Sequence, residues 1–319
     1  MLLDNRLGGS TRHHFDQYPP RDWEMRVPDD VLNSVVFIGR DCNGRTRWTS
    51  TGFLVAVPHG TNLAAGYLVA TRHSALKLDG LPFVLRFNRE SGPPVELPVP
   101  NDAKWWYHPT EPEAVDAAVL SISPPEETNY RAVSVANFLT DAVIAEQNIG
   151  PGDEVVCPGL FTKHTGTDRS YPILRTGTVA MMPAEPLPSV TIGDYTGPAS
   201  AYLVESRSLG GLSGSPVWVR QTIHLPVTPA RPGGGEVVRM QGPGPMYLMG
   251  LMHGHWTVKP EDANRYDFAP DRSPEPLALG ISVVVPAKKI REVLDHPELV
   301  ARRADAAREE ARRNAPTPT

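Results

Sequence analysis

The most informative segment of the sequence is the loop Gly210-Gly211-Leu212-Ser213-Gly214-Ser215-Pro216-Val217, which leads into a predicted strand at 217–220. Its small residues can bring a hydroxyl group and consecutive backbone N–H groups to one point. Acyl transfer needs this combination, because the nucleophile must lie beside donors that stabilise the developing oxyanion. A loop of Gly and Ser before a strand is also a common turn, so a second observation is needed.

That observation is a candidate base and a candidate acid earlier in the chain. His73 follows an apolar run at 67–70, and the end of a strand is where a rigid scaffold can present an imidazole to a cleft. Asp116 precedes an apolar run at 117–120, where a buried carboxylate is costly unless it has a partner such as an imidazole N–H. Either residue alone could have a purely structural role, but together they supply what a serine nucleophile needs.

Short runs of β-branched and aliphatic residues, separated by Gly, Pro, Asn and Asp, recur through most of the chain. This pattern predicts many short strands joined by turns. The 319 residues include 34 prolines and 27 glycines, a content that excludes an all-helical bundle or coiled coil. We therefore expect an all-β protein with sandwiches or closed barrels. The predicted strands are 34–38, 52–57, 66–71, 83–87, 117–122 and 132–135, then 154–157, 174–181, 200–205, 216–220, 246–252 and 279–285.

A short helix predicted at 140–148 separates these strands into two β units of similar size. Thr140 can cap the start of this helix, and Gly150 lies just beyond its end. The predicted organisation is an N-terminal arm at 1–30, a first β unit at 31–138, a second β unit with a C-terminal helix at 139–296, and a helical or disordered tail at 297–319.

The C-terminal helix is expected to begin at Pro286, since proline is favoured at the first helical position. Its apolar stripe is predicted to be Ile290, Val293 and Leu294. The tail at 297–319 is rich in Ala and Arg, which suits either a solvated helix or a contact for a regulatory partner protein. The segments 221–245 and 257–276 are predicted surface insertions near the second unit.

Charge and composition restrict the partners. The net charge of −5 and pI of about 6.1 do not suit a nucleic-acid partner, and no apolar run is long enough to span a membrane. Asp4 and Arg6 interrupt the apolar stretch that a signal peptide needs, so we expect a cytoplasmic location. Cys42 and Cys157 are the two cysteines; they fit a reducing compartment, although a single disulfide between them is the alternative. The Pro-, Arg- and Ala-rich usage suggests a bacterial source.

The segments around the candidate residues resemble the chymotrypsin-like (trypsin-like) serine peptidases, particularly the bacterial members without disulfides. The similar segments are 51–55 (the Gly-Phe strand), 69–74 (Thr-Ala-Ala-His-Cys), 115–120 (Asp-Ile-Ala-Val-Leu), 211–216 (Gly-Asp-Ser-Gly-Gly-Pro) and 280–286 (the final strand). The order His, Asp, Ser also argues against an α/β-hydrolase, whose order is Ser, acid, His. The resemblance implies two six-stranded antiparallel β-barrels with a C-terminal helix.

It also implies a serine endopeptidase that hydrolyses peptide bonds in proteins through an acyl-enzyme intermediate. Ser213 would attack the scissile carbonyl, His73 would accept and return its proton, and Asp116 would orient the imidazole. The backbone N–H groups of Gly211 and Ser213 would form the oxyanion hole. The alternative is a trypsin-like domain that serves as a peptide-binding or partner-triggered regulatory module. The expected partner is a protein or peptide substrate, and no metal or cofactor is expected.

Three residues depart from the family pattern. Arg72 stands before the histidine where a small residue is usual, and Ser74 replaces the cysteine of disulfide-bearing relatives. Leu212 precedes the serine where members activated by cleavage of a precursor carry an aspartate. We therefore expect no activation through an ion pair between that aspartate and a newly formed N-terminus.

The resemblance also implies where the primary substrate pocket lies. By resemblance, its wall consists of Arg207, Ser208, His253, Gly254 and His255, together with 280–282. The basic side chains would favour Glu or Asp at the cleaved position. Alternatively, Arg207 pairs with Glu205 at the surface, and the two histidines form a flexible wall of the pocket. The two histidines are not expected to bind zinc, because a third ligand is lacking.

Overall fold

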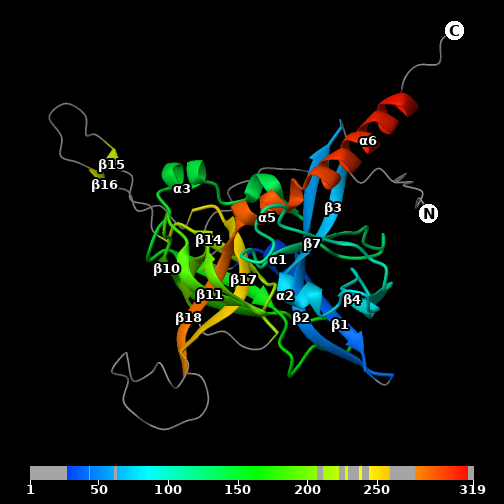
Figure 1. Cartoon of the computed structure of the whole chain (residues 1–319), viewed down its shortest axis with the longest axis horizontal. Helices are drawn as coiled ribbons and strands as arrows, with labels where there is room; N and C mark the ends of the chain where they lie inside the picture. Colours follow the sequence, from blue (N-terminus) through cyan, green and yellow to red (C-terminus); the bar gives the residue numbers. More distant parts are fainter. Residues whose placement is uncertain are drawn as a thin grey trace.

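The computed structural model describes residues 27–42, 44–60, 63–206, 211–222, 227–228, 237–238, 244–258 and 277–314. Residues 1–26 of the arm predicted at 1–30, and most of the two predicted insertions, lie outside these residues. The described end of the arm includes the first two residues of a helix at Asp29–Asn33. The described elements form two β units packed against each other, with helices at the chain's C-terminal end (Figure 1). In the first unit they are α1 (Asp29–Asn33), β1 (Val35–Asp41), β2 (Thr46–His59), β3 (Leu63–Ala70), α2 (Arg72–Leu76), β4 (Phe83–Phe87), β5 (Val95–Val99), β6 (Trp105–Tyr107), β7 (Ala118–Ser121), β8 (Val133–Ser134) and the 3-10 helix η1 (Val135–Asn137).

The remaining elements follow from residue 141 onward. They are α3 (Asp141–Gln147), β9 (Glu154–Gly159), β10 (Ile173–Met181), β11 (Leu187–Ile192), β12 (Tyr195–Ala199), β13 (Tyr202–Glu205), β14 (Pro216–Arg220), β15 (Val227–Thr228), β16 (Val237–Val238), β17 (Tyr247–Val258), β18 (Leu277–Pro286), α5 (Ala287–Leu294) and α6 (Pro297–Asn314). The helix predicted at 140–148 is α3. The Thr140 hydroxyl caps it by accepting from the Val143 N–H at 3.2 Å.

The first unit is an eight-stranded sheet in the order β5-β4-β1-β2-β3-β7-β6, with β8 added parallel to β2. The other strand pairs are antiparallel. Among the described strands, no pairing joins β5 to β6, so the pairing does not show the closed barrel expected for this unit. Pro98 in β5 has no N–H to donate to a further strand, which suits the edge of an open sheet.

The second unit contains a closed barrel of six antiparallel strands in the order β10-β13-β18-β17-β14-β9. This confirms the six-stranded barrel predicted for the second half of the chain. Its core includes Cys157, which is fully buried, whereas Cys42 is exposed on the first unit. Both cysteines are free, so the alternative of a disulfide between them is wrong.

The hairpin of β11 and β12 in the second unit was not predicted. Strands β11 and β12 pair with each other through a turn at Gly193, whose φ of +60° favours glycine. Apolar side chains of this hairpin pack on Val283 of β18 and not inside the barrel. Its strands alternate between buried and exposed residues over only a few positions, which is a weak signal in a sequence rich in turn residues.

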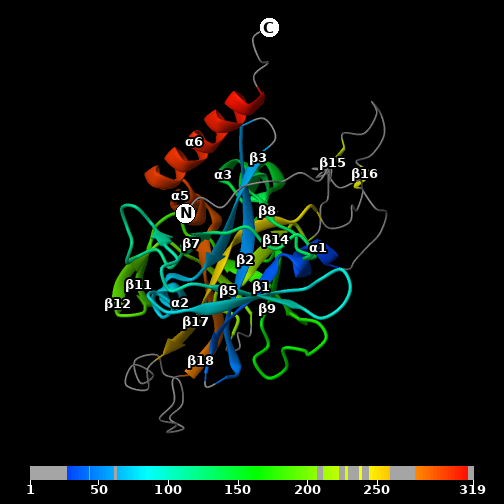
Figure 2. The ribbon, with the colours of Figure 1, turned by 90° about the vertical axis from the view of Figure 1, so that its right-hand side faces the viewer.

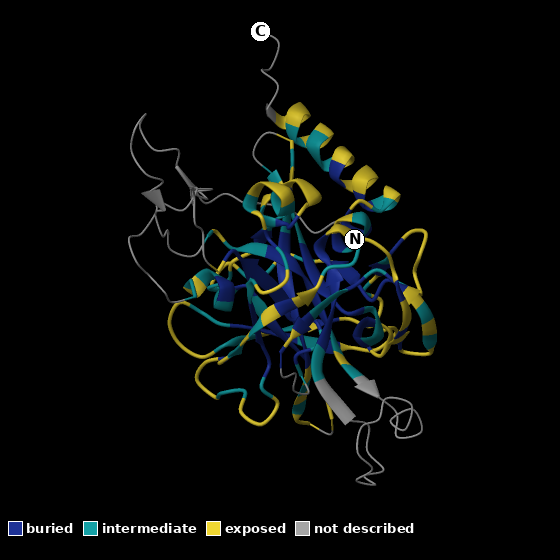
Figure 3. Cartoon of the chain, turned by 90° about the vertical axis from the view of Figure 1, so that its left-hand side faces the viewer, coloured by how far each residue is buried: buried dark blue, intermediate teal, exposed yellow. Residues whose placement is uncertain are grey.

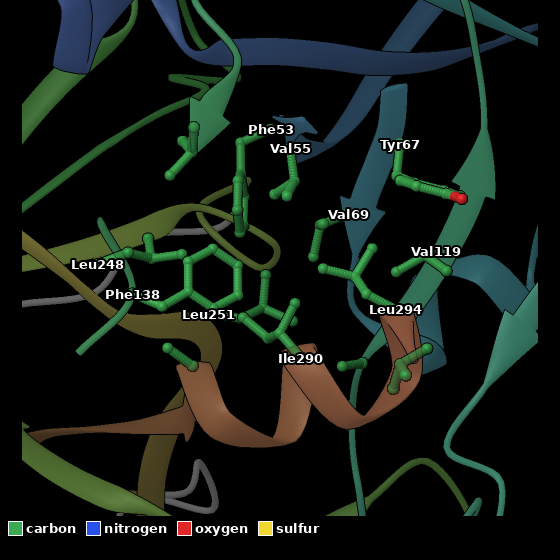
Figure 4. Packing of buried hydrophobic residues seen from close by; sticks show 14 of the residues in the cluster. Phe53, Val55, Tyr67, Val69, Val119, Phe138, Leu248, Leu251, Ile290 and Leu294 are labelled. Atoms are coloured by element: carbon green, nitrogen blue, oxygen red, sulfur yellow. The ribbon is translucent and has the colours of Figure 1, made fainter. Parts of the chain in front are cut away.

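The two units share a hydrophobic core that α5 covers. Phe53, Val55 and Val69 of the first sheet belong to the same cluster as Leu248 and Leu251 of β17. Figure 4 shows these side chains converging above α5, which points Ile290 and Leu294 into the cluster. The stripe predicted for this helix is fully buried, namely Ile290, Val293 and Leu294. The predicted C-terminal helix is therefore confirmed, and it joins the two units. It begins at Ala287, because Pro286 is extended and ends β18.

The segment predicted as a helical or disordered tail forms α6 up to Asn314. Arg303 anchors this helix: its guanidinium is buried and donates to the Tyr67 hydroxyl and to the Leu294 carbonyl, both at 2.9 Å. Figure 2 shows α6 lying beside the ends of β2 and β3. Buried residues concentrate where the two units meet, while the outer face of α6 is exposed (Figure 3). No helix within the described part of the chain is long and apolar enough to cross a bilayer.

Candidate active site

The pairing of β3 with β7 places the candidate base beside the candidate acid. Ala70 at the end of β3 lies opposite Ala118 at the start of β7. Because antiparallel strands run past each other, the residues just after β3 meet those just before β7. The chain turns into α2 at Thr71, and this puts His73 next to Asp116. The sequence alone placed both residues at strand ends, and this register explains their contact.

The carboxylate of Asp116 accepts three hydrogen bonds although it is fully buried. Its Oδ1 accepts from the backbone N–H of His73 at 2.9 Å, and its Oδ2 lies 2.8 Å from His73 Nδ1. The same Oδ2 lies 2.5 Å from Nδ1 of His253, which comes from β17 in the other unit. His73 and His253 meet edge to face, with ring centroids 5.6 Å apart.

These contacts determine where the protons lie on Asp116, His73 and His253. Burial alone would raise the pKa of Asp116, but the hydrogen bonds from His253 and His73 outweigh it and lower the pKa to about 2. An ionised carboxylate only accepts hydrogen bonds, so both imidazoles carry their proton on Nδ1. Nε2 of neutral His73 is then left with a free lone pair, as a general base requires.

Backbone hydrogen bonds to both β units hold the loop that carries Ser213. The Thr51 N–H of β2 donates to the Ser213 carbonyl at 3.1 Å, and the Gly214 N–H donates to the Met252 carbonyl of β17 at 2.9 Å. Gly214 has a φ of +90°, and a Cβ there would lie 1.9 Å from the Thr51 oxygen and 3.7 Å from the Thr71 nitrogen. The loop therefore sits against the chain that leads to His73. Between the described Ser213 and His73 side chains there is no hydrogen bond.

The predicted oxyanion donors lie at the start of the same loop. Gly211 has a φ of +103°, and its carbonyl accepts from the Thr51 hydroxyl at 2.7 Å. Within the described residues, no acceptor binds the N–H of Gly211 or that of Ser213. Leu212 between them is buried in the barrel core, where an aspartate would be out of place. The loop thus offers two free donors beside a half-buried hydroxyl.

The residues predicted to form the substrate pocket separate in the structure. His253 reaches the carboxylate of Asp116, so it belongs to the candidate catalytic group as well as to the strand that was expected to wall the pocket. Gly254 is half-buried and His255 is exposed on the same strand. Arg207 and Ser208 lie outside the described residues. Sequence reasoning missed the contact between His253 and Asp116, because it depends on how two distant strands pair.

Thr51 is a further residue of the site whose role the sequence did not show. It lies in a segment that was singled out only for its similarity to an early family strand. Its buried hydroxyl accepts from the Leu160 N–H at 2.9 Å and donates to the Gly211 carbonyl. A threonine before an otherwise apolar strand was the available signal.

Two groups of described side chains have the ligand types that metals use. The first is His73, Asp116 and His253, which are already joined by the hydrogen bonds given above. The second is His108, Glu111 and Glu292. In this second group Nζ of Lys289 lies 2.5 Å from Oε2 of Glu111 and 3.0 Å from Oε2 of Glu292. The ammonium group therefore already neutralises the carboxylates.

Neither the protein-family models nor the curated proteins include a match to this chain. Among solved structures, the chain is similar to an inactive mutant form of Rv3671c from M. tuberculosis H37Rv. The TM-score is 0.42 at 13% identity, over 84% of this chain and 88% of that chain. The function of the chain is therefore inferred from the geometry of its own site.

Proposed function

We propose that this protein is a serine endopeptidase that cleaves peptide bonds in proteins with Ser213, His73 and Asp116. The observation that supports this most strongly is the buried, ionised Asp116, which binds both the backbone N–H and Nδ1–H of His73. This arrangement fixes the imidazole tautomer and leaves Nε2 as the base. A purely structural histidine would not need its ring nitrogen kept free beside a loop with a serine.

In the proposed mechanism, Ser213 Oγ attacks the scissile carbonyl while Nε2 of His73 takes its proton. The imidazolium that forms is stabilised by the carboxylate of Asp116. The oxyanion is bound by the N–H groups of Gly211 and Ser213, which have no other described acceptor. His73 then returns the proton to the leaving amine, and a water molecule repeats these steps to hydrolyse the acyl-enzyme.

A fluorophosphonate probe tests the proposal, because it reacts with a serine only when the base and the oxyanion donors are in place. We expect the full chain to be labelled and the Ser213→Ala variant to remain unlabelled. Digestion of a mixed proteome by the two proteins would then map cleavage sites. Labelling that persists in Ser213→Ala would refute the assignment of the nucleophile.

The second candidate is a peptide-binding or partner-triggered module with little activity of its own. The observation that favours it is the missing hydrogen bond between the described side chains of Ser213 and His73. In that case wild type would resist labelling alone and would be labelled only after addition of a partner, for which the C-terminal helix α6 is the candidate contact. Labelling of the isolated chain at the rate of an active hydrolase would exclude it.

We also propose a preference for Glu or Asp at the cleaved position. His255, exposed on β17, and Arg207 remain the basic groups expected at the pocket, since His253 binds Asp116. Peptide profiling measures this preference directly. A preference for Lys, Arg or Phe would contradict it without affecting the proposed catalytic group.

A further inference from the structure

A bulge in β17 directs the side chain of His253 toward Asp116. In the pairing of β17 with β18, Met252 lies opposite Val284 and Gly254 lies opposite Val283, so His253 is the extra residue. Such a bulge changes the direction of the side chain it carries. The backbone of Met252 is fixed by the nucleophile loop, with its N–H donating to the Ser215 carbonyl at 2.8 Å. The backbone that carries His253 is therefore hydrogen-bonded to the loop that contains Ser213.

His253 is also a contribution of the second unit to an acid held by the first. Asp116, just before β7, and His73 of α2 belong to the first unit, whereas His253 comes from the closed barrel of the second. Without the His253 donor, Oδ2 of a fully buried carboxylate would have His73 as its single described donor. Loss of a charge-assisted hydrogen bond in a buried site is strongly unfavourable, so the third donor fixes where the carboxylate lies.

We propose that His253 is a positioning residue for the reaction, which holds Asp116 through its Nδ1–H and limits how strongly Asp116 attracts the proton of His73. This inference rests on the proposed function and deepens it. Among the described residues, the groups that act electrostatically on Asp116 are His73 from α2 and His253 from β17. Arg72, adjacent on α2, acts on Tyr107 of β6.

The test compares His253→Phe, which keeps an aromatic ring without a donor, with His253→Asn, which keeps a donor close to the position of Nδ1. We expect His253→Phe to slow fluorophosphonate labelling by about 10- to 100-fold, the loss that corresponds to a hydrogen bond to a charged group. His253→Asn should restore most of the rate. Equal rates for wild type and His253→Phe would overturn the proposal, as would a failure of His253→Asn to restore labelling of a folded variant.

The pH dependence of labelling tests whether His253 limits how strongly Asp116 attracts the proton of His73. With the His253 donor gone, the negative charge of the carboxylate acts on His73 alone and stabilises the imidazolium more strongly, so the acid limb of the labelling profile moves to higher pH. A limb that stays in place or moves to lower pH in His253→Phe would overturn this part of the proposal.

Proton NMR keeps this inference separate from the proposed function. Imidazole N–H protons bound to a carboxylate resonate far downfield. Among the described residues, wild type should show such signals from His73 and His253 on Asp116 and from His108 on Glu292, and His253→Phe should lack one of them. If wild type is not labelled but His253→Phe loses one of these signals, the proposed function fails and the contact of His253 with Asp116 stands. An unchanged set of downfield signals in His253→Phe would overturn the positioning role, whatever the labelling shows.

Discussion

The three donors on Asp116 explain why an amide should not replace its carboxylate. An asparagine at this position has one acceptor oxygen and an NH₂ group, which would face either the backbone N–H of His73 or the ring N–H groups of both His73 and His253. We expect Asp116→Asn to fold and to lose about 10⁴-fold in the rate of fluorophosphonate labelling, because His73 would be held in the wrong tautomer. Labelling kinetics and thermal unfolding of the variant check this.

The matched control is Ser213→Ala, which removes the nucleophile and leaves the hydrogen bonds of Asp116 intact. Its thermal unfolding should match that of wild type. Wild-type labelling rates in Asp116→Asn would show that the carboxylate has no catalytic role.

Gly214 illustrates a second constraint that acts at a single residue. A Cβ at this position would lie 1.9 Å from the Thr51 carbonyl oxygen, and the φ of +90° is strained for any L side chain. Gly214→Ala should lower the free energy of unfolding both through this backbone strain and through the clash. We expect the clash to add about 1–3 kcal/mol to the loss that the strain causes, because the crowded loop must shift. It should also lower the labelling rate, since the shift moves Ser213.

Gly92 provides the control for this substitution. It has a φ of +86°, and a Cβ there would meet no atom within 4 Å. Gly92→Ala therefore carries the backbone strain without the clash. If the two variants unfold at the same denaturant concentration and label equally fast, the close approach of Gly214 to β2 has no effect.

At the scale of elements, α5 holds the loop that leads to Asp116. The ring of His108 is buried, and its Nδ1 accepts from the Glu111 N–H at 3.0 Å. Its Nε2 therefore carries the proton and donates to Glu292 of α5 at 2.6 Å. Lys289 of α5 pairs with Glu111 on the same loop. The C-terminal helix thus fixes the segment immediately before the candidate acid.

We expect Glu292→Ala to destabilise the protein by about 1–3 kcal/mol, because it leaves the buried Nε2–H of His108 without its acceptor. Urea unfolding measures this. Lys288→Ala is the matched control on the same helix: its partner Asp141 lies 3.6 Å away and both side chains are exposed, so the loss should be below about 1 kcal/mol. Equal losses would show that the contact with His108 is not special.

The difference in unfolding free energy between wild type and Glu292→Ala should also depend on pH. Burial would raise the pKa of Glu292, but the hydrogen bonds from His108 and Lys289 outweigh it and lower the pKa. A carboxyl group whose pKa is lowered by folding stabilises the folded state above its ordinary pKa. That contribution is lost as the pH falls through the lowered pKa. The gap in unfolding free energy between wild type and Glu292→Ala should therefore narrow in acid.

The same scale shows how far the sequence predicts this fold. The pattern of short apolar runs predicted an all-β protein, and the helix stripe ending in Leu294 predicted α5, which the structure confirms. The closed six-stranded barrel of the second unit was implied by the family resemblance and is also confirmed. The same resemblance implied a closed barrel in the first unit, where the described strands pair as an open sheet. The sequence did not reveal this difference, because strand composition does not specify which strands pair. The hairpin of β11 and β12 was missed, since its burial depends on contact with Val283 of a distant strand.

The candidate site shows the same division between local and distant information. His73, Asp116 and Ser213 could be selected from their flanking residues, because each follows or precedes a recognisable strand or loop. The contact of His253 with Asp116 could not be predicted, because it depends on a bulge that exists only when β17 pairs with β18. Its residue type and strand were expected at the pocket, but its partner required the three-dimensional structure.

For the whole molecule, the site depends on how the two units are held together. The apolar cluster beneath α5 joins them without direction, whereas hydrogen bonds fix their alignment. Thr51 of the first unit makes three of these bonds with the second. Its N–H donates to the Ser213 carbonyl, and its hydroxyl links the Leu160 N–H to the Gly211 carbonyl. Thr51 therefore connects the first sheet to Gly211 and to Ser213, the two residues whose N–H groups are the proposed oxyanion donors.

Replacing Thr51 with valine keeps its shape and removes this link, leaving the Leu160 N–H and the Gly211 carbonyl without their partner. We expect Thr51→Val to lower the free energy of unfolding by about 1–3 kcal/mol and to slow fluorophosphonate labelling, because the orientation of Gly211 is no longer fixed. Thr49→Val, on the exposed part of the same strand, should change neither measurement appreciably. If Thr51→Val is destabilised but labels like wild type, the hydroxyl stabilises the interface between the units without positioning the oxyanion donors.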